Sequence, residues 1–91
     1  MVKWEYYVKY FPTGGGVEDP ETVLRKRHDD VDSDAQGLHK DGEWRQSWTL
    51  LDISFGKGFA EAEPVTRERA AAWARKWHAD GGLAKIPIDL E

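Results

Sequence analysis

The segment 28–42 holds the residues whose type and spacing come closest to a recognisable chemistry, the binding of calcium. Asp30, Asp32 and Asp34 stand two residues apart, which is the spacing of the first three ligands in an EF-hand loop. Such a loop also needs a glycine at its sixth position and a glutamate at its twelfth. This chain has alanine and aspartate there. We therefore interpret the segment as an exposed polar turn, and keep the three aspartates as the candidate metal ligands.

Other motifs that carry chemistry are also incomplete. Three glycines, 14–16, invite comparison with a phosphate-binding loop, but such a loop continues into Gly-Lys-Ser/Thr and a helix. Here a proline-containing turn follows. The histidines His28, His39 and His78 have none of the spacings of a zinc-binding pair, and no serine has the context of a nucleophile elbow. The sequence thus predicts no catalytic residues, no enzymatic activity and no cofactor.

Composition limits the classes of protein that remain. The chain has 91 residues, 33% of them charged, a net charge of −4 and no cysteine. This length predicts one domain, and the absence of cysteine fits a reducing compartment, so we expect a cytoplasmic protein. The chain contains no run of about 18 apolar residues, the length that would predict a membrane-spanning helix. Its negative net charge disfavours binding to nucleic acid. The final Leu-Glu has the look of a cloning remnant, so we expect the domain at 1–89 and a tag remnant at 90–91.

The first segment has the clearest strand pattern. Every second residue from Trp4 to Tyr10 is aromatic or β-branched, and the residues between them are charged, apart from Tyr7. Alternation of this kind is typical of a strand with one buried face. We expect the Trp4 face to belong to the core and Tyr7 to lie on the opposite face.

Further strands are predicted along the middle of the chain. Residues 22–28 (TVLRKRH) have no strongly apolar face, which favours a strand near an edge of the sheet. Asp41-Gly42 predicts a two-residue type I′ turn. A strand is expected to follow from Trp44 to Leu51, and the run FAEAEPV to add a short strand that ends at Pro64.

One helix is predicted near the C-terminus. Thr66 stands at an N-cap position before RERAAAWARKWHA, a run of good helix formers. Trp73 and Trp77 share a face with two alanines at helical spacing, and the glycines after Asp80 stop the helix. The fold class is therefore α+β, with a small antiparallel sheet of three to four strands and one C-terminal helix packed on one face.

Two runs, GLHKDGEWRQSWTL and EPVTRERAAAWARKW, resemble a pattern of small bacterial α+β proteins. In these proteins a hairpin of the form Leu-x-x-Asp-Gly-x-Trp leads through a polar strand to a Thr-x-x-x-Ala helix. The resemblance covers roughly residues 37–78. It implies a compact α+β fold and carries over no active site.

The aromatic content favours a binding function. Five Trp, three Tyr and three Phe are more than one sheet face and one helical stripe require. We expect a non-enzymatic module that binds a protein partner or a second copy of itself. Two alternatives are a nucleic-acid-binding module that uses the same residues and a calcium-binding loop module. The expected contact residues are Tyr7, Lys9, Phe11, Arg25 and Arg27.

Overall fold

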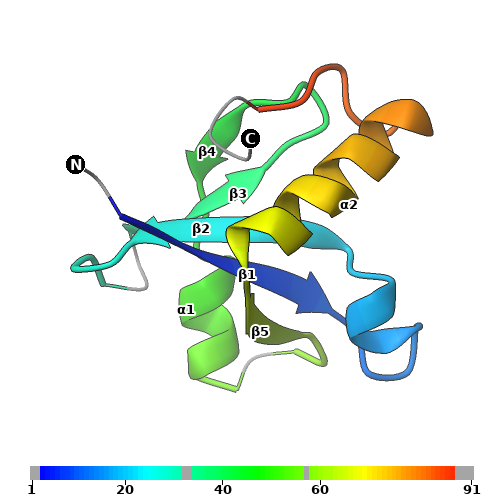
Figure 1. Ribbon diagram of the computed structural model, residues 1–91. Coiled ribbons are helices and arrows are strands. Elements are labelled where there is room, and N and C mark those ends of the chain that lie inside the picture. Colours follow the sequence, from blue (N-terminus) through cyan, green and yellow to red (C-terminus); the bar gives the residue numbers. More distant parts are fainter. Residues whose placement is uncertain (1–2, 32–33, 57, 88–91) are drawn as a thin grey trace.

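Alternating apolar residues between Trp4 and Tyr10 form the strand β1, which pairs with a neighbour on each side. The computed structural model describes residues 3–31, 34–56 and 58–87. Its antiparallel sheet has the strand order β4-β3-β2-β1-β5 and carries two α-helices (Figure 1). The fold is thus α+β as predicted, with five strands rather than three to four. The elements are β1 (Trp4–Tyr10), the 3-10 turn η1 (Gly16–Glu18), β2 (Thr22–Arg27), β3 (Gln36–Leu38), β4 (Trp44–Gln46), α1 (Thr49–Ser54), β5 (Glu61–Val65) and α2 (Arg67–Ala79).

The C-terminal helix α2 covers the predicted core face of the sheet. Tyr6 and Val8 are 5% and 0% exposed, and they share one cluster with Trp73 and the buried alanines of α2. Thr66 caps the helix as predicted, because its hydroxyl accepts the Arg69 N–H at 3.1 Å. The helix crosses the sheet diagonally, so the amino-terminal end of β1 extends beyond it (Figure 1). We call this side of the sheet the α2 face.

The opposite side, the α1 face, is also covered by a helix, whereas the sequence predicted a single helix on one face of the sheet. The strand predicted from Trp44 to Leu51 ends at Gln46, and the chain then turns into α1. The Ser47 hydroxyl accepts the Thr49 N–H at 3.2 Å, which competes with continuation of the strand. Leu50 then packs on Leu24, with Tyr7 beside them. A second, smaller core therefore lies under α1.

The strand β2 lies in the middle of the sheet rather than near its edge. Val23 and Leu24 are 0% and 1% exposed, and even Arg25 is only 6% exposed. The prediction of an edge strand was wrong because the charged residues of β2 were taken to indicate solvent exposure. Arg25 is instead accommodated by two tryptophan rings on the α2 face.

The turn between β3 and β4 has three residues rather than the predicted two. His39 N–H donates to Glu43 O at 3.0 Å, and Gly42 N–H donates to His39 O at 2.9 Å. Gly42 has a φ of 81°, whereas Asp41 stays at negative φ. A type I′ turn needs positive φ at both central positions, so only the glycine of the predicted pair behaves as expected.

The segment after α2 returns to this turn. Gly81 has a φ of 83° where the helix stops, and Ala84 N–H then donates to Lys40 O at 2.8 Å. The described chain continues to residue 87 without a further strand. The expected end of the domain at 89 and the suggested remnant 90–91 lie outside the described residues. Neither α-helix of the described chain has the length and apolar character needed to cross a bilayer.

Candidate functional site

The five residues predicted to contact a partner are divided between the two faces of the sheet. Lys9 pairs with Thr22 and Tyr7 with Leu24, so Tyr7 and Lys9 belong to the α1 face. Arg25 pairs with Tyr6 and Arg27 with Trp4, which places both arginines on the α2 face. Phe11 follows β1 and is 39% exposed. The five therefore do not form one continuous surface, because side chains of neighbouring strand positions point to opposite faces.

Arg25 is a structural residue in this fold. Its guanidinium carbon lies 3.9 Å from the ring centroid of Trp4 and 4.2 Å from that of Trp44. Its Nε donates to Gln36 Oε1 at 2.8 Å. The planar cation thus lies between two indoles, a geometry in which cation–π attraction is strong because water is excluded. This stack joins β1, β2, β3 and β4.

An aromatic groove lies beside α1 and contains two of the predicted contact residues. Its volume is about 330 Å³, within the range of binding clefts. Phe59, in the connection before β5, is 90% exposed, and Lys9 Nζ lies 5.5 Å from the centroid of Phe11. The groove is lined by Lys9, Phe11, Thr49, Asp52, Ile53, Gly58, Phe59 and Ala60.

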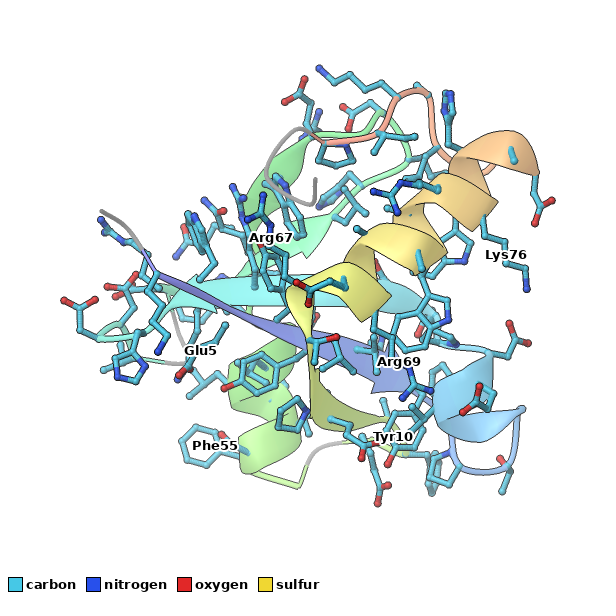
Figure 2. The ribbon with its side chains drawn as sticks, viewed as in Figure 1. Glu5, Tyr10, Phe55, Arg67, Arg69 and Lys76 are labelled. Carbon is cyan, nitrogen blue, oxygen red and sulfur yellow. The ribbon has the colours of Figure 1, made fainter. Side chains whose placement is uncertain are left out.

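Two more large apolar side chains are exposed near α1 and do not line the groove. Trp48 is 58% exposed and Phe55 is 70% exposed, and Phe55 projects outward from the end of α1 (Figure 2). Sequence reasoning missed Phe55 and Phe59 because both were placed in or next to strands. The signal available in the sequence was the pair of glycines 56 and 58, because closely spaced glycines indicate a loop that exposes its neighbours. In the structure both glycines have positive φ.

A chain of polar groups on the α1 face joins the ends of β1 and β2. Tyr7 donates its hydroxyl to Glu5 Oε1 at 3.1 Å, and His28 Nδ1 lies 2.8 Å from Glu5 Oε2. The hydrogen bond from His28 is the main cause that lowers the pKa of Glu5 from its ordinary value of 4.5. A carboxylate that orients a histidine occurs in acid–base catalysis, but this imidazole is 64% exposed. We read the chain as a surface link between two strands.

The lowered pKa of Glu5 gives a pH dependence with a definite sign. A carboxylate with a depressed pKa in the folded state stabilises the fold above its unfolded pKa, and this contribution is lost as the pH falls through the folded value. We expect an NMR titration of the Glu5 carboxyl carbon to give a pKa below 4.5, and His28→Ala to move it upward. The matched control is His39→Ala, at an exposed turn elsewhere. An unchanged Glu5 titration in His28→Ala would contradict the link.

The candidate metal ligands are only partly within the described residues. Asp32 lies outside them. Asp30 and Asp34 line a second, polar cavity of about 560 Å³, and Asp30 accepts a hydrogen bond from Arg27 Nε at 3.1 Å. In the described ranges no three carboxylate, imidazole or thiol groups come close enough together to hold a metal ion.

Comparison with other proteins adds no family to this geometry. The chain matches no family model, no curated protein and no solved structure with which it was compared. What the fold defines is therefore a class only: a small α+β domain whose described residues form a five-stranded antiparallel sheet and line, among other pockets, an aromatic and a polar cleft. Function must be inferred from those clefts.

Proposed function

We propose that the protein is a non-enzymatic binding module that holds an apolar side chain of a partner protein in the aromatic groove. The observation that carries the proposal is Phe59, a phenylalanine that is 90% exposed at the rim of a cleft. Exposure of a whole phenylalanine ring beside other apolar groups is typical of an interaction site. Aromatic anchors of this kind dominate the energy of protein interfaces.

The composition of the groove supports a protein ligand. Phe11, Ile53 and Phe59 supply apolar surface, while Lys9 and Asp52 supply one charge of each sign at its walls. The Lys9 ammonium is held by Glu21 at 2.9 Å, so it adds little net charge. An apolar centre with a mixed polar rim is the usual anatomy of a protein interface.

Two features favour a different protein over a second copy of the chain. The net charge of −4 makes two copies repel each other.

The open edge of β5 is also poorly suited to pairing with a strand of a second copy. Lys3 O accepts the His28 N–H at 2.9 Å, so alternate residues from Lys3 to Lys9 direct their backbone groups to β2. The residues of β5 opposite these positions, Ala62 and Pro64, then face the open edge, where the proline supplies no donor.

The two alternatives receive less support. A nucleic-acid surface would need Lys9 and Phe11 beside Arg25 and Arg27, and these residues lie on different faces, with Arg25 buried. A calcium loop would use Asp32, which lies outside the described residues. We therefore keep the protein-binding proposal, and the cytoplasm as its location because the chain has no cysteine.

The groove can be tested without a known partner. Peptides selected by the parent protein from a random library should contain an apolar or aromatic anchor. Phe59→Ser should weaken their binding by about tenfold or more, as expected for a hot-spot residue. Phe55→Ser removes another exposed phenylalanine ring, one that does not line the groove, and should leave the affinity unchanged. Both substitutions should change the free energy of unfolding by less than about 0.5 kcal/mol.

Three outcomes would count against this assignment. If Phe55→Ser weakens binding as much as Phe59→Ser, the ligand recognises exposed rings in general and not the groove. If neither variant affects any selected peptide, the groove is not the binding site. If the parent dimerises in sedimentation equilibrium and Phe59→Ser makes it monomeric, the occupant of the groove is a second copy.

A further inference from the structure

The polar cavity lies on the α2 face, beside Trp4 at the amino-terminal end of β1. The ribbon shows that α2 does not cover this end of the sheet (Figure 1). Four neighbouring strands each contribute one side chain to its floor: Trp4 from β1, Arg27 from β2, Gln36 from β3 and Gln46 from β4. The register places these residues on the same face, because Trp4 is opposite Arg27 and Gln36 is opposite Gln46. The cavity is thus built on strands and is separate from the aromatic groove.

Several of its side chains are already fixed by contacts within the protein. The Arg25 guanidinium packs on Trp4 at 3.9 Å. Arg25 also donates to Gln36 Oε1 at 2.8 Å, which fixes the orientation of the Gln36 amide. Arg27 is held by Asp30 at 3.1 Å. Side chains fixed before binding lose little entropy on binding, which is how sites gain affinity.

The second wall is formed by Asp30 and Asp34, two of the described residues between β2 and β3. Among the charged groups of the lining, one guanidinium is paired with Asp30 and the second carboxylate, Asp34, leaves a net charge of −1. Donors and acceptors balance: Arg27 only donates, the aspartates only accept, and the two glutamines do both. A lining of this kind suits hydroxyl groups, since each hydroxyl both donates and accepts a hydrogen bond.

We infer that this cavity binds a neutral polyhydroxylated ligand, a saccharide, between Trp4, Arg27, Gln36 and Gln46 on the sheet and Asp30 and Asp34 above them. Carboxylate, guanidinium and carboxamide groups are planar forks that reach two neighbouring hydroxyls at once. The Trp4 indole adds apolar surface for the C–H groups of a sugar ring. The volume of about 560 Å³ is within the range of small-molecule sites.

The test is an NMR titration of the intact protein with a panel of mono- and disaccharides, including glucose, galactose, mannose, N-acetylglucosamine, maltose and cellobiose. We expect saturable shifts of the Trp4 indole N–H and the side-chain amides of Gln36 and Gln46 for at least one sugar. Asp34→Ala should weaken that binding by about tenfold, the loss expected for hydrogen bonds to a charged group. Asp80→Ala removes the same negative charge at the exposed end of α2 and should have no effect on sugar binding.

A parallel titration with spermidine and with an arginine amide distinguishes the main alternative ligand. If these cations give the shifts and the sugars do not, the two carboxylates decide the specificity and the saccharide inference is wrong. Equal weakening by Asp34→Ala and Asp80→Ala would also overturn it, because the effect would then be general electrostatics. The same holds if no sugar gives saturable shifts with a dissociation constant of about 10 mM or below.

Discussion

Replacing Trp73 by alanine should lower the free energy of unfolding by about 3–5 kcal/mol, the usual cost of removing a buried aromatic side chain. Trp73 is 9% exposed and packs in the main cluster with Tyr6, Val8 and Val23. The Arg69 guanidinium also lies 5.1 Å from its ring centroid. Small domains have only about 5–15 kcal/mol of stability in total. Denaturant unfolding followed by circular dichroism would measure the loss.

The matched control is the same substitution at an exposed tryptophan. Trp48 is 58% exposed and precedes α1, so Trp48→Ala should cost less than about 1 kcal/mol. The sequence placed Trp48 within a strand that runs to Leu51, whereas in the structure this residue caps the start of α1. Equal losses from Trp73→Ala and Trp48→Ala would contradict the docking of α2 on the sheet.

Arg25→Ala should also be strongly destabilising, by about 2–4 kcal/mol. Each cation–π contact of a desolvated guanidinium contributes up to about 2 kcal/mol, and the hydrogen bond to Gln36 about 1 kcal/mol. Arg25→Lys should recover only part of this loss, since an ammonium cannot stack flat between Trp4 and Trp44. Thermal and chemical unfolding of the three proteins would give the order parent, lysine variant, alanine variant.

Arg27→Ala provides the comparison for Arg25. Arg27 is two residues further along the same strand, but its side chain is 54% exposed and its ion pair is with Asp30. Exposed ion pairs typically contribute less than about 1 kcal/mol. If Arg25→Ala were as mild as Arg27→Ala, the buried stack would not be a stabilising feature of the fold.

The sequence correctly predicts the two elements, β1 and α2, in which the local residue pattern matches the face that is buried in the structure. β1 alternates strictly, and its apolar positions Tyr6 and Val8 are buried as expected. α2 combines a capping threonine, helix-forming residues and a terminating glycine, and its bounds, Arg67–Ala79, are those of the predicted run. In both elements a single periodic pattern decides which face is buried, so no long-range information is needed.

The errors arise where a long-range contact overrides the local pattern. In β2, Arg25 is compatible with a central position only because Trp4 and Trp44, from distant parts of the sequence, lie on both sides of it. In the run after Gln46, a short apolar stretch fits a strand or a helical turn equally well. The local hydrogen bond of Ser47 and the packing of Leu50 on Leu24 favour the helix.

The candidate site could be predicted only where its residues follow a local pattern. Lys9 and Phe11 follow from the β1 alternation, and both line the aromatic groove. Ile53 and Phe59 join them only because α1 folds back onto the sheet beside β5. The assignment of Arg25 and Arg27 to the same surface failed because the strand pairing, which places them opposite Tyr6 and Trp4, cannot be read from a single sequence.

The proposed function is tested most directly by locating a bound peptide on the protein. A peptide selected by the parent protein would carry a nitroxide label next to its apolar anchor, and the broadening of amide signals would be recorded. We predict strong broadening at Phe11, Ile53 and Phe59 and little at Trp4 and Gln36, which lie on the other face of the sheet. Broadening centred on Trp4 and Gln36, with the Phe59 signal intact, would contradict the assignment of the aromatic groove.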